Sequence, residues 1–385
     1  MKKTLQQHLD PADGPKRILA LDGGGIRGAL TLGYLERLEQ ILKSKHPHIK
    51  DFRLCDYFDL IGGTSTGSII GAALSIGMSV GEIKEKYFTL GKIIFGKKND
   101  WWNIFEVKHM VKANYDSRPL EDELKKIFKD YTLGNDQHIK TGLCIVAKRA
   151  DTNSVWPFLN HPGGKFYDSE MGTNKNILLR DAVRASAAAP TYFLPITIDV
   201  GQGIKGAFVD GGVSMANNPA LQLLMVATLD GFPFHWKKGA DNILVVSVGT
   251  GMTKMEKLPK DIDKNNQLSW AKQIPDMFMQ DASWLNQLML QWMSQSPTAR
   301  TIDMETGDLS NDSLAPAPII SYLRYNVTIA PEELKKITGL NYTQKKIDDL
   351  SEMSRAENCE ELYNIGEAAG KLEMPESHFP DKFNI

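Results

Sequence analysis

Cysteine is scarce in this sequence of 385 residues, and its three cysteines, Cys55, Cys144 and Cys359, lie far apart. An odd number of widely spaced cysteines supports neither a disulfide framework nor a zinc cluster. An excess of either charge is also lacking, because 45 lysines and arginines nearly balance 47 aspartates and glutamates. No basic run is long enough to form a patch for nucleic acid. The composition therefore predicts a reducing, cytoplasmic location and argues against nucleic acid as a partner.

Long hydrophobic segments are rare as well. Two lysines stand near the N-terminus, but no apolar stretch follows them, so we expect no secretory signal peptide. Residues 60–81 carry no charge over a length that could span a membrane. Because this segment is rich in glycine, serine and threonine, a buried strand, turn and helix is the preferred interpretation. We expect no transmembrane helix, and only a peripheral, transient contact with membranes.

Apolar segments alternate with amphipathic ones along the first 250 residues, which predicts an α/β fold. A short apolar strand, a glycine turn and an amphipathic helix follow one another over residues 17–44, and the pattern recurs over residues 57–77. A further helix is expected to end at Pro190. These units predict a mainly parallel sheet with helices on both faces and ligand sites at the carboxyl ends of its strands. Further strand candidates are "TGLCIVA", "GAFVD" and "NILVVSVGT".

The domain organisation is expected to be simple. Residues 1–16 form a polar leader, and residues 17–385 form one domain without a convincing linker or internal repeat. Residues 254–312 are polar and rich in methionine and tryptophan, without strand candidates, and residues 331–373 have a helical period. Residues from about 254 to 385 are therefore predicted to form a less regular, mostly helical C-terminal layer.

A G-x-S-x-G sequence occupies residues 63–67, with Ser65 at its centre. A strand candidate precedes it and a helix candidate follows, which is the context of a nucleophile elbow. The flanking glycines, Gly63 and Gly67, permit the sharp turn, and the helix N-terminus favours a developing anion beside the serine. The alternative is a chance match in a glycine-rich bend of a buried core.

A glycine-rich loop, "LDGGGIRG", covers residues 21–28. Gly23, Gly25 and Gly28 also satisfy the G-x-G-x-x-G pattern of dinucleotide-binding proteins, but the next strand ends in the serine turn instead of a carboxylate. Successive glycines expose backbone amides, which favours binding of a small anion such as a tetrahedral oxyanion. Arg27 beside the loop has three open interpretations: it holds the loop, attracts a lipid phosphate, or is a surface arginine.

The candidates for the general base that would activate Ser65 are His235 and Asp210, which both lie much later in the sequence. His235 would complete the order serine, acid, histidine, but it lies in the aromatic loop "GFPFHWKKG" without an acidic partner, so a packed or surface position is favoured. Asp210 ends the strand candidate "GAFVD", which places it at the sheet edge that should carry Ser65. A turn-forming Asp-Gly is the alternative for Asp210.

Taken together, these segments resemble the patatin-like phospholipases, a family of lipid acyl hydrolases with a three-layer α/β fold. The resemblance runs from about residue 17 to residue 251 and continues more loosely through "SYLRYNVTI" and the helical tail. No motif position departs from the family pattern. The segments that carry the resemblance are the glycine loop, "YFDLIGGTSTG", "RASAAAPTYF", the Asp-Gly-Gly with "NNPA", and "ILVVSVGTG".

The resemblance implies a Ser-Asp dyad in which Ser65 is the nucleophile and Asp210 the base. It also implies an oxyanion hole made by the backbone amides of Gly23, Gly24 and Gly25, and it calls for no metal and no cofactor. An aspartate with an ordinary pKa of about 4 is a weak base at neutral pH, so the dyad requires desolvation or substrate-coupled proton transfer. Supporting positions are Arg27, Gly63, Gly67, Gly211 and Gly212.

The implied reaction is hydrolysis of acyl esters of glycerolipids, phospholipids first, through an acyl-Ser65 intermediate. An acyltransferase or broad esterase with the same dyad, and a catalytically idle lipid-binding regulator, are the alternatives. Residues 92–105, with Trp101 and Trp102, and residues 283–293 are candidate interfacial segments, because tryptophan favours the headgroup level of a bilayer. Both segments are equally compatible with a position in the core.

Overall fold

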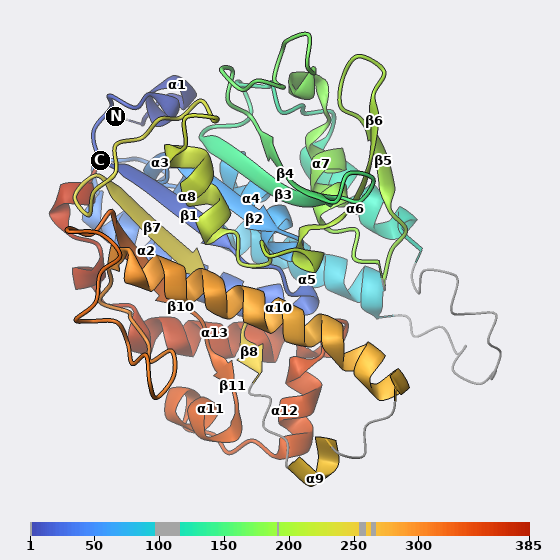
Figure 1. The fold of residues 1–385 in the computed structure, drawn as a ribbon, viewed down its shortest axis with the longest axis vertical. Coiled ribbons are helices and arrows are strands. Elements are labelled where there is room, and N and C mark those ends of the chain that lie inside the picture. The colour runs from blue at the N-terminus through green and yellow to red at the C-terminus, as the bar shows by residue number, and fades with distance from the viewer. Residues whose placement is uncertain (1, 97–115, 191, 254–258, 263–266) are drawn as a thin grey trace.

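One large mixed sheet runs through the computed structural model, which describes residues 2–96, 116–190, 192–253, 259–262 and 267–385 (Figure 1). Within these residues the sheet has nine strands, and a second sheet has two. The order in the large sheet is β5-β6-β3-β2-β1-β7-β10-β9, and β4 also pairs with β3. The strands are β1 (Lys16–Leu21), β2 (Leu60–Thr64), β3 (Gly142–Arg149), β4 (Ser154–Leu159), β5 (Ile196–Asp199), β6 (Lys205–Asp210), β7 (Ile243–Val248), β8 (Met252–Thr253), β9 (Ser294–Gln295), β10 (Ile320–Tyr325) and β11 (Thr328–Ile329).

The centre of the large sheet is parallel, as the alternation of strands and helices predicts. β1 pairs in parallel with β2 and β7, and β2 pairs in parallel with β3. β4 and β6 are antiparallel to β3. β4 follows β3 directly in the chain, as strands joined by a short connection do, and β6 also pairs antiparallel with β5. Every residue of β1, β2 and β7 is buried, as expected for strands covered on both faces.

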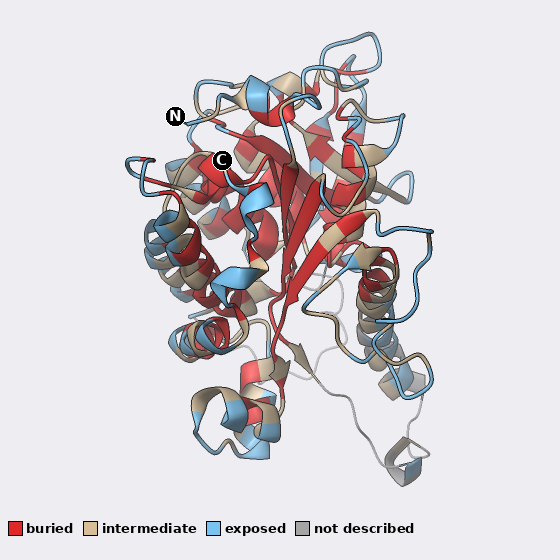
Figure 2. Cartoon of the chain, turned by 90° about the vertical axis from the view of Figure 1, so that its left-hand side faces the viewer, coloured by how far each residue is buried: buried red, intermediate tan, exposed pale blue. Residues whose placement is uncertain are grey.

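Helices cover both faces of the sheet, and the alternation of side chains along β1 shows how (Figure 2). Leu19 and Leu21 pack into a core with α2, α4 and α13, whereas Ile18 and Ala20 pack into a second core with α8. This arrangement confirms the predicted three-layer α/β class. The helices are α1 (Leu5–Leu9), α2 (Gly28–Lys45), α3 (Leu54–Tyr57), α4 (Thr66–Ser75), α5 (Val80–Phe95), α6 (Arg118–Phe128), α7 (Leu179–Ser186), α8 (Ala220–Thr228), α9 (Pro259–Ile262), α10 (Gln267–Trp292), α11 (Pro331–Thr338), α12 (Gln344–Ser351) and α13 (Cys359–Glu373).

Both ends of the chain pack into the fold more closely than expected for a polar leader and an outer helical layer. The first 16 residues contain α1, whose His8 is completely buried. Downstream of residue 254, β10 lies beside β7 in the large sheet, and α13 packs along α2. The C-terminal third therefore contributes strands to the central layer as well as helices to the outer ones.

Candidate active site

Ser65 lies on a sharp turn between β2 and α4. Its backbone has φ 53° and ψ −124°, a conformation that non-glycine residues rarely adopt, and it forms the N-cap of α4. The turn is possible because the two flanking glycines allow very close backbone contacts. A Cβ on Gly63 would lie 2.1 Å from the Gly67 carbonyl oxygen, and one on Gly67 would lie 2.2 Å from the Leu21 carbonyl oxygen. The two glycines thus allow α4 to pack closely against β1 and β2, with Ser65 at the edge of the sheet.

The Ser65 hydroxyl donates a hydrogen bond of 2.6 Å from its Oγ to Oδ2 of Asp210, the last residue of β6. The other carboxylate oxygen, Oδ1, accepts from the Gly212 amide at 2.7 Å. Asp210 is only 3% exposed. Burial raises its pKa to about 6, although the hydrogen bonds from Ser65 and Gly212 oppose that rise. Desolvation therefore makes this carboxylate a stronger base than an exposed aspartate.

Ser186, in the last turn of α7, fixes the backbone of the elbow through a hydrogen bond. The Ser65 amide donates to Oγ of Ser186 at 2.9 Å, and that hydroxyl donates to the carbonyl of Val146 in β3 at 2.6 Å. Ser186 is completely buried. The backbone amide of Ser65 is thus already engaged, so the donors of an oxyanion hole beside it would have to come from elsewhere.

The glycine-rich loop follows β1 and runs beside the elbow. Its Gly23 amide donates to the Asn217 carbonyl at 3.0 Å. In the part of the chain that the structure describes, the Gly24 and Gly25 amides have no hydrogen-bond acceptor. A Cβ on Gly24 would collide with the Thr250 side chain, at 2.2 Å from its Oγ1. Of the three amides expected in the oxyanion hole, two are therefore open and one is used to fix the loop.

Two further side chains keep the loop in place against the elbow. The Tyr87 hydroxyl, on α5, donates to the Gly25 carbonyl and also shares a hydrogen bond with the hydroxyl of Thr66. On the other side, the Ile26 amide donates to the Met353 carbonyl at 2.8 Å. These contacts orient the loop from both of its sides.

A cavity of about 680 Å³ opens above the Ser65 hydroxyl. We call it the acyl cavity, because Ser65, Asp210, Gly24 and Gly25 line one end and the remaining lining is largely hydrophobic. Its size and apolar character suit a hydrocarbon chain. The apolar side chains that line it include Ile26, Ile69, Leu90, Ile94, Phe95, Leu120, Tyr192 and Phe193.

The structure brings together most of the residues that the sequence singles out. Ser65, Asp210 and the glycine loop meet at one edge of the sheet, and Gly212 binds the dyad carboxylate. Gly211 is required by close packing, because a Cβ there would lie 2.4 Å from the Val146 carbonyl oxygen. Arg27 lines a second cavity, which shares Asn217 and two methionines with the acyl cavity.

His235 is exposed, and among the described residues no histidine forms a hydrogen bond with Ser65 or Asp210. Ser186, Tyr87 and Asn217 were missed at the sequence level, because each acts through contacts between distant segments. For Ser186 the sequence offered only a lone serine in the small-residue run "RASAAAP", and for Asn217 only the repeated asparagine of "NNPA".

The two candidate interfacial segments have different outcomes. Most of residues 92–105, with Trp101 and Trp102, lies outside the described residues. Residues 283–293 belong to α10, where Leu285 is 55% exposed and Trp284 lines the second cavity. Within the described ranges, no helix combines the length and apolar character needed to cross a bilayer, and no group of three or more potential metal-binding side chains is found.

Similar sequences occur among known proteins. Residues 19–224 match the family model described as patatin-like phospholipase. A cGAMP-activated phospholipase of Escherichia coli is 34% identical over 214 residues, which cover 55% of this chain and 56% of the relative. A cGAMP-activated phospholipase of Vibrio cholerae is 30% identical, covering 61% and 64%, and patatin-like protein 4 of Arabidopsis thaliana is 29% identical, covering 62% and 60%. The chain thus spans less than two thirds of the length of these relatives.

Proposed function

Because this chain belongs to the patatin-like phospholipase family, we propose that it is a lipid acyl hydrolase in which Ser65 is the nucleophile and Asp210 the general base. The observation that carries the proposal is the 2.6 Å hydrogen bond from the Ser65 hydroxyl to the buried Asp210 carboxylate, at a strained elbow beside two open amides. A structural serine would need neither the strain nor the raised carboxylate pKa.

The proposed reaction has two steps. Asp210 takes the hydroxyl proton while the Ser65 oxygen bonds to the ester carbonyl carbon, and the carbonyl oxygen becomes an anion facing the Gly24 and Gly25 amides. When the ester bond breaks, the proton passes from Asp210 to the departing glycerol oxygen. Water then attacks the acyl-serine and gives its proton to Asp210, and the fatty acid and the free Ser65 hydroxyl are released. Each amide donor in such a site lowers the barrier by about 3 to 4 kcal/mol.

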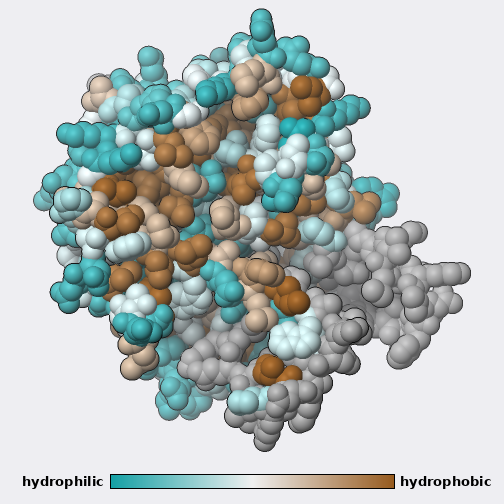
Figure 3. Space-filling view, in the orientation of Figure 1, coloured by the Kyte–Doolittle hydropathy of each residue, from teal (hydrophilic) through white to brown (hydrophobic). Residues whose placement is uncertain are grey.

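The proposed substrates are glycerolipids, with phospholipids first. Support comes from the family and from the acyl cavity, whose hydrophobic walls lead away from the dyad. We further propose that the protein reaches lipids by transient contact of the N-terminal half of α10 with the membrane. Phe278 on this helix is 70% exposed, and single apolar side chains are interspersed with polar ones on the face that carries α10 (Figure 3).

Regulation by a cyclic dinucleotide is a further part of the proposal. It is supported by two similar proteins described as cGAMP-activated phospholipases. If the proposal holds, the purified protein should hydrolyse lipid slowly by itself and faster when cGAMP is added. Equal rates with and without cGAMP and other cyclic dinucleotides would remove this part and leave the hydrolase proposal intact.

The decisive experiment incubates the protein with a mixed lipid extract and identifies the products by mass spectrometry, with Ser65→Ala as control. We expect free fatty acid and lysolipid from the wild type, and a fluorophosphonate probe bound to Ser65. Acyl transfer to added alcohols in preference to water would identify an acyltransferase. Lack of both turnover and labelling, with and without cyclic dinucleotides, would favour the idle lipid-binding regulator.

A further inference from the structure

The second cavity has a volume of about 290 Å³ and is lined by neither Ser65 nor Asp210, although Asn217, Met279 and Met353 line both cavities. We call it the polar cavity, because carboxamide, hydroxyl and charged side chains make up most of its lining. Its volume is near the lower end of the range for small-molecule sites, so it suits one planar ring system better than an acyl chain.

Gln287, on α10, offers a hydrogen-bond acceptor to this cavity. It is 5% exposed, and its Nε2 donates to Oε1 of Gln291 at 2.9 Å. Gln291 is fixed in turn, because its Nε2 donates to the carbonyls of Arg300 and Asp308. The orientation of the Gln287 amide is therefore set, and among the described residues no donor pairs with its Oε1.

Asn326, the residue after β10, offers a hydrogen-bond donor. It is 6% exposed, and its Oδ1 accepts from the Gly251 amide at 2.8 Å. Its Nδ2 is then left as a donor, which pairs with no acceptor in the part of the chain that the structure describes. Because Gln287 and Asn326 line the polar cavity and are buried elsewhere, these two atoms are the parts of them that a ligand can reach.

One acceptor and one donor match the edge of a nucleobase, which carries both kinds of group, whereas a phosphate or carboxylate would use donors only. Trp284, one helical turn before Gln287 on α10, lines the cavity too. Nucleobases of every type stack on such an aromatic ring. The charges of Arg324 and Asp22 neutralise each other through hydrogen bonds of 2.8 Å and 2.6 Å, so this pair leaves room for a neutral ring.

The polar cavity is coupled to the glycine loop through the residues that hold this loop. Oγ1 of Thr250 donates to the Gly23 carbonyl at 2.8 Å, and the Gly23 amide donates to the Asn217 carbonyl at 3.0 Å. The Met353 carbonyl accepts from the Ile26 amide at 2.8 Å. Because Thr250, Asn217 and Met353 all line the polar cavity, an occupant contacts the supports of the loop that carries the proposed oxyanion donors.

We propose that the polar cavity is a regulatory site for one base of a nucleotide, and that its occupation holds the glycine loop in the catalytic arrangement. This inference rests on the proposed function, because its effect is on the acyl-Ser65 step, and it gives the proposed nucleotide regulation a site. Asn326 forms the link, since a base bound by its Nδ2 lies beside Gly251, which follows Thr250 in the chain. Activation then follows from tighter binding of the base when the loop is in place.

The binding test is calorimetric titration of Ser65→Ala with cGAMP, so that hydrolysis plays no part. Trp284→Leu and Gln287→Met should each raise Kd about 10-fold or more, because a stacking surface or a hydrogen-bond acceptor is lost. Gln291 keeps a backbone donor to its Oε1 in Gln287→Met. Trp270→Leu is the matched control, since Trp270 lies on the same helix but lines neither cavity, and it should leave Kd unchanged. Equal Kd values in Trp284→Leu and Trp270→Leu would overturn the site.

Smaller probes identify the group that is recognised. AMP or GMP, which carry a base, should bind to Ser65→Ala, whereas ribose 5-phosphate, which has none, should not. Equal Kd values for GMP and cGAMP would keep the nucleobase site and assign it to mononucleotides. Binding of ribose 5-phosphate as tight as that of GMP, or no binding of any of these nucleotides, would overturn the proposal.

Thr250→Val tests the coupling between the site and the loop. This variant lacks the hydroxyl that binds the Gly23 carbonyl. It should bind cGAMP with little change in Kd, but the ratio of kcat on a soluble ester with and without cGAMP should fall to about one. Thr250→Ser should restore the ratio, and an undiminished ratio in Thr250→Val would contradict the coupling. If no ester is cleaved with or without cGAMP, the hydrolase proposal fails and the calorimetric titrations alone decide the site.

Discussion

At the residue scale, the properties of the site depend most on the burial of Asp210. Its carboxylate accepts hydrogen bonds from Ser65 and Gly212, yet burial still raises its pKa to about 6. Only the ionised form can take the serine proton, so kcat/KM should rise about tenfold per pH unit below pH 6 and level off above it. A pH profile on a soluble ester measures this, and a flat profile from pH 5 to 8 would contradict Asp210 as the base.

The same group should affect stability in the opposite sense. Because its pKa is higher in the folded state than the ordinary 3.8, its contribution favours folding at low pH and is lost as pH rises through about 6. The loss amounts to about 3 kcal/mol over the full window. Asp210→Asn cannot ionise, so its free energy of unfolding relative to the wild type should increase between pH 4 and pH 8 in urea denaturation. His235→Ala, at an exposed position, should not show this trend.

Ser186 is a positioning residue whose role can be tested separately. Ser186→Ala removes the acceptor of the Ser65 amide and leaves a buried donor unsatisfied, which costs about 1 to 3 kcal/mol of stability. Because the elbow is then less well oriented, we expect kcat to fall on the order of 10-fold or more with little change in KM. Ser75→Ala is the control, since Ser75 is equally buried but bonds the Ala72 carbonyl at the other end of α4. Equal kcat values in the two variants would show that Ser186 is not needed for positioning.

At the scale of elements, α10 lines both cavities with one residue and exposes several apolar residues to solvent. Met279 lines both cavities, while Trp270, Ile274, Met277 and Phe278, spaced at helical intervals, are between 37% and 70% exposed. Side chains of this kind insert into the interface of a bilayer. The helix thus carries both a residue that lines the two cavities and a row of exposed apolar side chains.

Phe278→Asp should weaken binding to vesicles of phosphatidylcholine and phosphatidylglycerol by about 10-fold or more, since burial of one aromatic side chain contributes about 1.5 to 3 kcal/mol. Vesicle sedimentation measures the binding. Activity on a soluble ester should remain unchanged, because Phe278 does not line either cavity. Met304→Asp is the control, as Met304 is 99% exposed but lies outside α10. If both variants bind vesicles as the wild type does, α10 is not the membrane contact.

The sequence predicts those elements whose signal is local. Strand β2, the elbow with Ser65, and strand β6, which ends at Asp210, could be predicted because apolar runs stop at glycine turns. The strand order and the antiparallel direction of β6 could not be predicted, since they depend on pairing between distant segments. For the same reason Ser186, which is 121 residues from Ser65, had no sequence signal of its role. The expected strand "YFDLI" is in part the end of α3, so the boundary moved by three residues.

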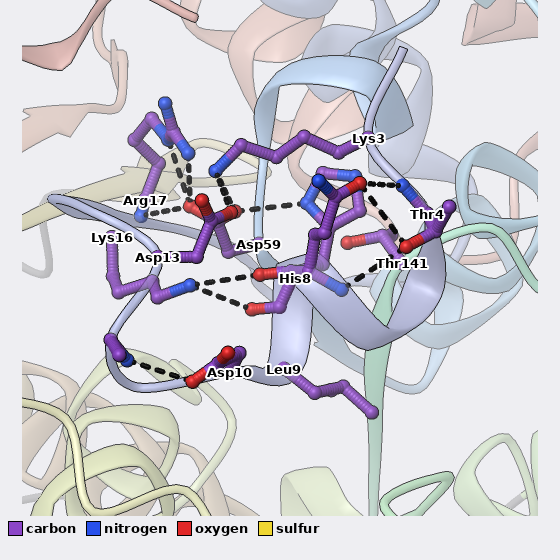
Figure 4. A network of polar contacts seen from close by, with 12 residues as sticks. Lys3, Thr4, His8, Leu9, Asp10, Asp13, Lys16, Arg17, Asp59 and Thr141 are labelled. Atoms are coloured by element: carbon purple, nitrogen blue, oxygen red, sulfur yellow. Dashed lines mark hydrogen bonds and ion pairs between the residues drawn. The ribbon is translucent and has the colours of Figure 1, made fainter.

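At the scale of the whole molecule, a buried charge network joins α1, the start of β1 and the residue before β2 (Figure 4). Asp59, which is completely buried, accepts hydrogen bonds from the Arg17 side chain at 2.6 Å and 2.8 Å and pairs with His8 at 2.9 Å. Arg17 also donates to the Phe383 carbonyl at 3.3 Å. Burial by itself would raise the pKa of Asp59, but Arg17, His8 and Lys3 outweigh it and hold the pKa at about 2.

Arg17→Met should therefore lower the free energy of unfolding by about 3 to 5 kcal/mol at pH 7, because Asp59 becomes a buried charge without its main partner. Adding Asp59→Asn should recover part of the loss, and urea denaturation measures both. In the wild type this carboxylate stabilises the fold above pH 3.8, and the stabilisation disappears as the pH falls through about 2. Lys45→Met, which removes an ion pair with the exposed Asp381, should change little. A small effect of Arg17→Met would show that the ends are held by packing alone.

The engagement of the Ser65 amide by Ser186 has a consequence for how activity can be controlled. Ser65 follows β2 and Asp210 ends β6, whereas the two amides without an acceptor among the described residues belong to the loop after β1, which Tyr87 and Met353 hold. A shift of that loop by about 1 Å would misalign the anion donors and slow the reaction on the order of 100-fold without breaking the bond between Ser65 and Asp210. If the proposed hydrolase is regulated, its inactive state can keep the bond between Ser65 and Asp210, and activation requires only that Gly24 and Gly25 are realigned.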